Sequence, residues 1–183
     1  RGADDLPDGW IARMKASMRA IWPVFNTNRM VCEYAERFYL PADARFRRLT
    51  ASQLERARAL TQWKKNVLWN WPRVRMVSAQ AVEADRLIVG SELRVQADIA
   101  LGDLRPEDVM VELYHGPLDT QHQIAGGVAA PMACVGPNGS GSYTFTGSIA
   151  LQASGRFGYT VRILPKHDDL VSPYDTGLIR WAD

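Results

Sequence analysis

The chain has 183 residues, of which 46% are hydrophobic, and a formal net charge of +2. That composition supplies enough apolar side chains for a sizeable core. No run of about 18 uncharged apolar residues occurs, so we expect no membrane-spanning helix and a cytoplasmic location. The sequence starts at Arg1 without a signal-peptide pattern, and we therefore interpret it as a piece of a longer protein.

Charge is distributed unevenly along the chain. Residues 1–72 carry 13 Lys and Arg against 7 Asp and Glu, whereas residues 73–183 carry 9 against 13. The change near Pro72 predicts a boundary between a basic and an acidic segment. Because Glu33, Glu36 and Glu55 interrupt the basic residues, the first segment is typical of a solvated or docked helix surface, and we expect no nucleic-acid partner.

Helical periodicity dominates residues 1–72. Apolar residues recur at three- and four-residue spacing in three stretches, around 10–22, 30–40 and 53–71. The first helix should end before Pro23 and the second at Pro41, because proline disfavours continuation of a helix. The corner at residues 25–28 offers side-chain oxygens to cap the second helix. Thr50-x-x-Gln53 is a capping-box pattern for the third. We therefore predict about three helices.

From Arg73 the apolar period changes to two. The clearest strand is Leu93–Ile99, and the strongest turn signal is Gly136-Pro137-Asn138-Gly139-Ser140-Gly141. Seven or eight short strands with turns every 8–12 residues predict a two-sheet antiparallel sandwich of immunoglobulin-like type over residues 73–183. The predicted fold class is α+β, with a helical segment followed by an all-β sandwich.

Residues that carry chemistry are scattered. His115, His122 and His167 fall on predicted turns and loops without metal-ligand spacing. The two Gly-rich stretches, Gly126-Gly127 and Gly139-x-Gly141, are interpreted as hairpin turns, because neither precedes a helix that could hold a phosphate. The four lysines lie in neither an apolar nor a glycine-rich setting that favours a Schiff base; they are Lys15, Lys64, Lys65 and Lys166. We expect no catalytic residue, no metal and no cofactor in this chain.

Cysteines and tryptophans allow more than one interpretation. Cys32 and Cys134 are far apart in sequence and are interpreted as two free, buried thiols. Trp63, Trp69 and Trp71 could stack on sugars, but at helical spacing packing in a core or interface is the favoured interpretation.

Specific runs of sequence resemble the C-terminal end of bacterial α-glucan (glycogen, maltodextrin) phosphorylases, in the short branch of that family. The most specific run is Phe25-Asn26-Thr27-Asn28-Arg29-Met30-Val31-x-Glu33-Tyr34. Further matching runs are Leu6-Pro7-x-Gly9-Trp10, Met14-Lys15-x-Ser17-Met18, Phe38–Ala42, Val109–Tyr114, Gly116–Leu118, Ser154–Arg162 and Gly177–Ala182. The resemblance covers nearly the whole chain.

The resemblance implies a parent glycosyltransferase that cleaves terminal α-1,4-linked glucose with phosphate and releases glucose 1-phosphate. In that family a lysine upstream of the matching region holds pyridoxal phosphate, so the cofactor belongs to the parent and no catalytic role transfers to this chain. The family also implies that residues 1–42 are the edge of an upstream catalytic domain of the same chain and that residues 43–72 connect it to an appended sandwich at 73–183.

Three roles for the sandwich stay open. It is a structural accessory, a module that binds α-glucan, or a module for homo-oligomer assembly. For glucan binding the candidate contacts are the aromatic residues Tyr114, Phe157 and Tyr174. Coplanar exposed aromatics on one sheet face would favour this second role, and a long exposed sheet edge would favour the third.

Overall fold

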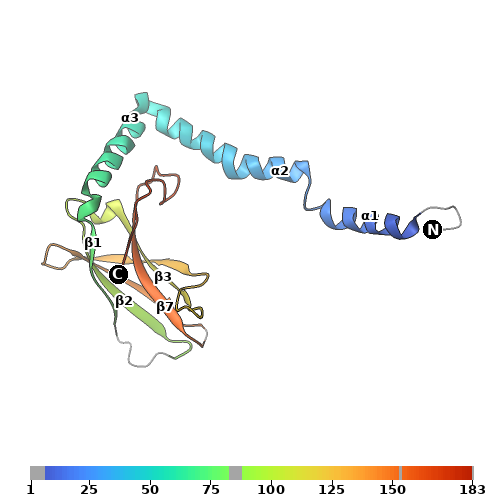
Figure 1. Cartoon of the computed structure of the whole chain (residues 1–183). Coiled ribbons are helices and arrows are strands. Elements are labelled where there is room, and N and C mark those ends of the chain that lie inside the picture. Colours follow the sequence, from blue (N-terminus) through green and yellow to red (C-terminus); the bar gives the residue numbers. More distant parts are fainter. Residues whose placement is uncertain (1–6, 83–87, 153, 183) are drawn as a thin grey trace. The chain divides into compact units, whose positions relative to one another are not determined.

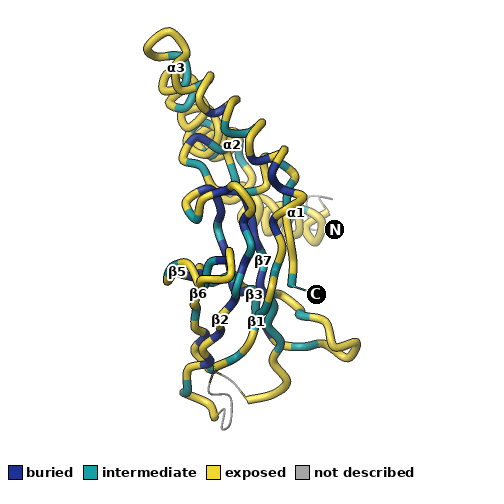
Figure 2. The backbone as a smooth tube through the Cα atoms, turned by 90° about the vertical axis from the view of Figure 1, so that its left-hand side faces the viewer, coloured by how far each residue is buried: buried dark blue, intermediate teal, exposed yellow. Residues whose placement is uncertain are grey.

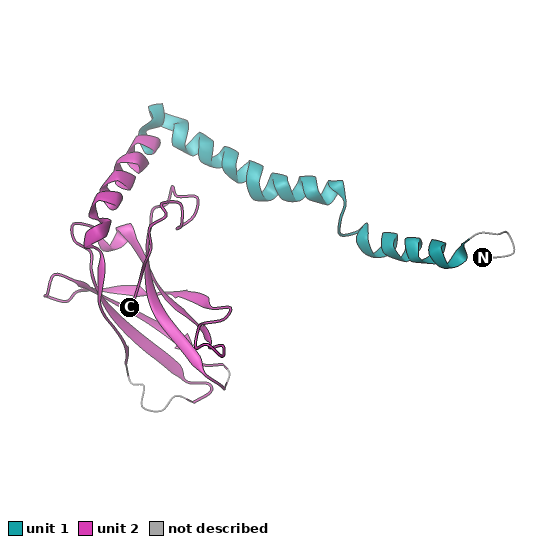
Figure 3. Ribbon diagram, viewed as in Figure 1, with its two compact units in different colours: residues 1–56 teal, residues 57–183 magenta. Residues whose placement is uncertain are grey.

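A computed structural model describes residues 7–82, 88–152 and 154–182. The chain divides into two compact units, residues 1–56 and residues 57–183 (Figure 3). The first unit is helical, and the second contains the end of the last helix and two antiparallel β-sheets (Figure 1). The α+β class is therefore confirmed. Within the described ranges no helix has both the length and the apolar character needed to cross a bilayer.

Unit 1 begins with helix α1 (Asp8–Ile21), which ends before Pro23 as predicted. Helix α2 (Thr27–Tyr34) follows a short corner. Its N-cap is Asn26, whose Oδ1 accepts a hydrogen bond of 2.8 Å from the backbone N–H of Arg29. This bond satisfies one of the free N–H groups of the first turn, so the predicted cap is confirmed.

The predicted end of the second helix at Pro41 is wrong. Helix α2 continues through a π-helical turn, η1 (Ala35–Tyr39), directly into α3 (Leu40–Asn70). The N–H of Leu40 reaches back to the carbonyl of Ala35, so the turn before Pro41 is wider than an α-helical one. That widening accommodates a proline ring, which would otherwise meet the carbonyl four residues earlier. The described residues thus form one short and one long helical stretch where three helices were predicted.

The predicted capping box at Thr50-x-x-Gln53 is also absent. Helical geometry is interrupted inside α3 at Ala51–Leu54, where Ser52, Gln53 and Leu54 have positive φ angles of 49°, 57° and 67°. The Thr50 hydroxyl donates to the Phe46 carbonyl at 2.8 Å, the bond that a threonine inside a helix commonly makes, and so it does not cap the following turn. The interruption falls where the sequence predicted the capped start of a third helix. Its cause is instead a left-handed turn at residues 52–54.

The described residues of unit 2 form two four-stranded antiparallel sheets. Sheet I has the spatial order β1 (Arg75–Val82), β2 (Glu92–Ala100), β6 (Tyr143–Ala150), β5 (Ala133–Pro137). Sheet II has the order β4 (Val128–Pro131), β3 (Val109–Pro117), β7 (Phe157–Pro165), β8 (Arg180–Trp181). Short 3₁₀ turns lie at η2 (Trp71–Arg73) and η3 (Pro106–Asp108). The predicted antiparallel two-sheet arrangement is confirmed, while its immunoglobulin-like type stays a prediction.

One core lies between the two sheets. Along β2 the residues Leu93, Val95, Ala97 and Ile99 are buried and their neighbours are polar, as the period of two predicted. Figure 2 shows the same alternation of buried and exposed residues along the strands. Sheet II contributes Val109, Val111, Leu113, Val161 and Ile163, and helix α3 contributes Val67 and adjoins buried Trp71.

Helix α3 is fixed to the sandwich through Trp63. The Trp63 Nε1–H donates to Asp108 Oδ1 at 2.8 Å, and its ring lies 4.7 Å from the His167 ring between centroids. At the next residue, Lys64, the Nζ atom lies 3.1 Å from Asp175 Oδ2. These contacts hold the last turns of α3 against η3 and the segment that follows β7.

Candidate functional site

Two of the three predicted glucan-contacting aromatics converge on Arg162 at the outer surface of sheet II. The Arg162 Cζ lies 5.2 Å from the centroid of the Tyr114 ring and 5.8 Å from that of Tyr174. A third aromatic, Trp181, lies 5.4 Å from the same atom. Guanidinium groups are attracted to aromatic faces at such distances. We call Glu112, Tyr114, Arg162, Tyr174 and Trp181 the Arg162 cluster.

Strand pairing places the members of the Arg162 cluster together. Glu112 on β3 is directly opposite Arg162 on β7, and Arg162 is opposite Trp181 on β8. Tyr114 lies two residues beyond Glu112, and therefore on the same face of β3. Tyr174 comes from the segment between β7 and β8. Four parts of the sequence thus contribute to one surface.

Arg162 and Glu112 form a nearly buried ion pair. The Arg162 Nε donates to Glu112 Oε2 at 2.6 Å, and the two side chains are 12% and 14% exposed. A charge-assisted bond with this little solvent contact is stronger than an ion pair in water. The pair neutralises the cluster, while Tyr174 and Trp181 remain 55% and 41% exposed. The surface thus combines open aromatic faces with a charge-balanced polar pair.

Gly127 allows the Tyr114 ring to lie where it does. A Cβ atom at Gly127 would collide with three atoms of the Tyr114 ring, including its hydroxyl oxygen. Trp181 then meets Tyr114 edge-on, with ring centroids 5.6 Å apart and an interplanar angle of 77°. The Tyr114 and Trp181 rings are therefore not coplanar. They surround the guanidinium from different directions.

Phe157, the third predicted contact, is not linked to the Arg162 cluster by any ring or cation–π contact in the described structure. Its ring lies 5.8 Å from that of His115, near one end of β7. Burial lowers the pKa of His115, and its Nδ1 has no hydrogen-bond partner among the described residues. Phe157 also lines an open hollow of about 380 Å³ together with Leu93, Leu151 and Tyr159.

Sequence reasoning missed Arg162, Glu112 and Trp181 as members of a site. Glu112 and Arg162 each lie between two buried residues, which indicates that they face outward, whereas no such alternation marks Trp181. Alternation does not reveal which outward residues lie opposite one another, because that requires the register of β3, β7 and β8.

The three tryptophans of α3 and η2 differ in their surroundings. Trp63 is partly buried and hydrogen-bonded, and Trp71 is buried, so both pack as expected. Trp69 does not pack in the core, since 78% of it is exposed, and its packing in an interface stays a prediction. The two cysteines differ from prediction: Cys32 and Cys134 are free but exposed.

A separate polar group on sheet I centres on Asp98. The Thr144 hydroxyl donates to Asp98 Oδ1 at 2.6 Å, and the Ser78 hydroxyl donates to Oδ2 at 3.1 Å. The bond from Thr144 lowers the pKa of Asp98 most, partial burial opposes it, and Ser78 and Asn138 lower the pKa further. In the described part of the chain no three His, Cys, Asp or Glu side chains form a group suited to a metal ion.

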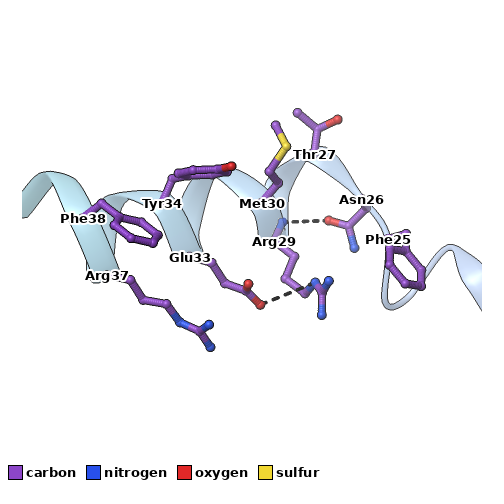
Figure 4. A pocket seen from close by; sticks show the side chains of 9 residues that line it. All are labelled: Phe25, Asn26, Thr27, Arg29, Met30, Glu33, Tyr34, Arg37 and Phe38. Carbon is purple, nitrogen blue, oxygen red and sulfur yellow. Dashed lines mark hydrogen bonds and ion pairs between the residues drawn. The ribbon is translucent and has the colours of Figure 1, made fainter.

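Unit 1 presents an uncovered surface of a different kind. None of the residues of α1, α2 and η1 is buried. Along α2 and η1 an open hollow of about 530 Å³ is lined by Phe25, Met30, Tyr34 and Phe38 together with charged residues. Figure 4 shows Arg29, Glu33 and Arg37 along one side of this helix and Met30 and Tyr34 on the other; Arg29 Nε lies 3.6 Å from Glu33 Oε1.

Comparison with known proteins gives consistent matches. Residues 71–183 match the family described as Glycogen phosphorylase C-terminal domain. Glycogen phosphorylases of Mycobacterium bovis and Mycobacterium tuberculosis are each 30% identical over 178 residues, which is 97% of this chain and 21% of theirs. A maltodextrin phosphorylase of Thermococcus litoralis is 32% identical over 176 residues, 94% of this chain and 20% of its own.

The chain therefore spans about a fifth of the length of the curated relatives it matches. The family match begins at Trp71, directly after helix α3, and covers both sheets, whereas the matches to the relatives extend into the helices before it. The resemblance read from the sequence is confirmed, and the chain belongs to the glycogen phosphorylase family, whose C-terminal domain it contains at residues 71–183.

Proposed function

We propose that this chain is the non-catalytic C-terminal part of an α-glucan phosphorylase. Phosphorolysis of terminal α-1,4-glucosyl units to glucose 1-phosphate then belongs to the upstream part of the longer protein. The relatives' names, glycogen phosphorylase and maltodextrin phosphorylase, and their fivefold greater length support this assignment.

Pyridoxal phosphate is assigned to the upstream part as well. A lysine that carries this cofactor needs an enclosed setting that shifts its amine toward the neutral form. Here Lys15, Lys65 and Lys166 are exposed, and Lys64 is paired with Asp175. The lysines of this chain do not fit the cofactor, and we derive no catalytic step from them.

The helices before the sandwich are proposed to dock on that upstream part. Residues 1–42 form the edge of the catalytic domain, residues 43–72 connect it to the sandwich, and residues 73–183 form an immunoglobulin-like accessory domain. The observation that carries this proposal is the exposure of the large apolar side chains of residues 10–46; they are Trp10, Met14, Met18, Ile21, Trp22, Val24, Phe25, Met30, Val31, Tyr34, Phe38, Tyr39, Leu40 and Phe46. Because these side chains are 42–72% exposed, covering each one contributes less than the roughly 1.5–3 kcal/mol of a fully exposed apolar side chain.

The extent of the sequence matches supports the same division. The C-terminal domain family begins at residue 71, whereas the relatives match 97% of the chain and so extend through the helices. The helices thus resemble the part of the relatives that precedes their C-terminal domain. An apolar surface left uncovered in this chain fits an interface with that preceding part.

The test is an activity assay in two parts. The 183-residue chain alone, supplied with maltoheptaose, inorganic phosphate and pyridoxal phosphate, is expected to form no glucose 1-phosphate. Adding it to the separately expressed upstream part should raise phosphorolysis by that part. Glucose 1-phosphate formed by the chain alone would contradict the proposal, as would an upstream part that neither binds the chain nor responds to it.

Contact with α-glucan is the second candidate role for the sandwich. Tyr114 and Trp181 do not meet the expectation of coplanar rings, since their planes are 77° apart. The role is supported instead by the convergence of Tyr114 and Tyr174 on Arg162, because ligand sites combine aromatic side chains with a few placed polar groups. Oligomer assembly has less support. The edge strand β1 carries Arg75 and a register irregularity between Met76 and Ser78, features that discourage pairing with another chain.

A cytoplasmic location is part of the proposal. Cys32 and Cys134 are free and exposed, which fits a reducing compartment better than an oxidising one.

A further inference from the structure

We propose that Arg162, Glu112, Tyr174 and Trp181 form a subsite that binds one or two glucose units of an α-glucan on the outer surface of sheet II. This inference rests on the proposed function for the identity of the polymer. It adds the residues that recognise the sugar. Two of them, Arg162 and Glu112, are charged, and Trp181 lies on the C-terminal strand β8.

The charge of the Arg162 cluster selects a neutral ligand. Arg162 and Glu112 compensate each other at 2.6 Å, so an anion would meet the carboxylate and a cation would meet the guanidinium. A sugar without charged groups meets neither penalty. Glucan chains are neutral polyhydroxyl compounds and therefore fit this balance.

The same two side chains retain hydrogen-bonding capacity for such a ligand. Arg162 uses Nε for Glu112, and its two Nη atoms have no hydrogen-bond partner among the described residues. Glu112 accepts at Oε2, which leaves Oε1 to accept from a ligand. Adjacent sugar hydroxyls both donate and accept, so a planar guanidinium beside a carboxylate oxygen matches a vicinal pair of them.

The aromatic members supply the apolar contact. Tyr174 is 55% exposed and Trp181 41% exposed, although both rings also lie within 6 Å of the Arg162 Cζ. Each ring therefore has one part against the guanidinium and another part open to solvent. The open part can cover the C–H face of a glucose ring while the Arg162 Nη atoms bind its hydroxyls.

Calorimetric titration of the 183-residue chain with maltoheptaose tests the subsite. Tyr174→Ala removes an exposed ring, and Arg162→Lys keeps a positive charge beside Glu112 but removes the planar fork. Trp69→Ala is the matched control, because Trp69 is the more exposed aromatic at 78% and lies outside the cluster. Cellohexaose is the ligand control, since it is a neutral glucan with β-linkages. Circular dichroism establishes that each variant is folded.

The subsite predicts saturable maltoheptaose binding of roughly millimolar affinity or tighter. Tyr174→Ala and Arg162→Lys should each weaken it at least about tenfold, and Trp69→Ala should leave it unchanged. Absence of binding by the unsubstituted chain would overturn the subsite, as would binding that both cluster variants retain. Equal binding of cellohexaose would overturn its assignment to α-glucan. None of these results decides the accessory role, which the phosphorolysis assay tests separately.

Discussion

Arg162 and Glu112 lie directly opposite each other on β7 and β3 and are joined by a hydrogen bond of 2.6 Å on the outer surface of sheet II. An outward-facing ion pair is usually well solvated, but here three aromatic rings surround the guanidinium. The rings come from β3, from β8 and from the segment between β7 and β8. The pair thus links the C-terminal strand to the centre of the sheet. Its loss should therefore lower the stability of the fold as well as the proposed binding of α-glucan.

Glu112→Gln should destabilise the fold by about 2 kcal/mol, because it leaves the nearly buried Arg162 charge without its counter-ion. Urea unfolding followed by circular dichroism measures the change. The control is Asp103→Asn, which breaks the exposed ion pair between Arg73 and Asp103 and should cost less than about 1 kcal/mol. Equal effects of the two substitutions would show that the Arg162 pair is solvated like an ordinary surface pair.

Gly127→Ala should displace the Tyr114 ring, because the added methyl group would occupy the same space. We expect a loss of about 1–3 kcal/mol in the free energy of unfolding. Gly9→Ala is the matched control, since Gly9 has no heavy atom within 4 Å of its added Cβ and lies in helix α1. Alanine there should be neutral or mildly stabilising. If Gly127→Ala is also neutral, the Tyr114 ring does not rest on that glycine.

Trp63→Phe should weaken the attachment of α3 to the sandwich. Phenylalanine keeps most of the apolar ring but lacks the N–H that donates to Asp108 at 2.8 Å. Because Asp108 is buried, losing this donor should cost about 1–2 kcal/mol of unfolding free energy. Trp69→Phe changes an exposed ring and should stay within about 0.5 kcal/mol of the unsubstituted chain. A comparable loss at both positions would contradict a specific role for the Trp63 hydrogen bond.

The Asp98 carboxylate should make stability depend on pH. Its pKa in the folded chain is lowered from 3.8, chiefly by the Thr144 hydroxyl, so its contribution is present above about pH 3.8 and is lost as pH falls through the folded pKa. Thr144→Val should therefore lower stability at pH 7, and the difference from the unsubstituted chain should shrink below about pH 4. Urea unfolding at a series of pH values measures this difference.

Thr146→Val is the matched control for that series, because Thr146 lies two residues along the same face of β6 and has no side-chain hydrogen bond in the described structure. Its effect should be small and independent of pH. If Thr144→Val lowers the free energy of unfolding by the same amount from pH 7 to pH 3, the loss does not come from the Asp98 carboxylate.

Local patterns predicted the elements of this fold well where one face of a strand is buried. The alternation of Leu93, Val95, Ala97 and Ile99 identified β2, because only an extended chain brings these four residues to one side. The cap at Asn26 was equally local, since its acceptor and the N–H of Arg29 are three residues apart.

The prediction of helix boundaries failed where two local signals competed. Pro41 signals a helix end, but the π-helical turn just before it accommodates the ring and the helix continues. Thr50 and Gln53 match a capping box, but the Thr50 hydroxyl bonds to Phe46 behind it. A sequence pattern does not show which of two available hydrogen bonds a side chain makes.

The candidate site could be predicted only in part. Tyr114 and Tyr174 were proposed as exposed aromatics, but their common partner Arg162 is 48 residues from Tyr114 and lies on β7, whereas Tyr174 lies in the segment after that strand. The pairing of Arg162 with both Glu112 and Trp181 depends on the register of three strands. Long-range register follows from packing of the whole sheet, which one unaligned sequence does not specify.

Residues 10–46 of unit 1 present an apolar surface, and we propose that an upstream domain of the longer protein covers it. Binding of an apolar fluorescent dye to the 183-residue chain, measured together with its mass by sedimentation, tests this most directly. The claim predicts strong dye binding or self-association, and a reduction of either when Phe25, Met30 and Phe38 are replaced by serine. A monomer that binds no dye would contradict it, because the apolar side chains of the helices would then need no partner.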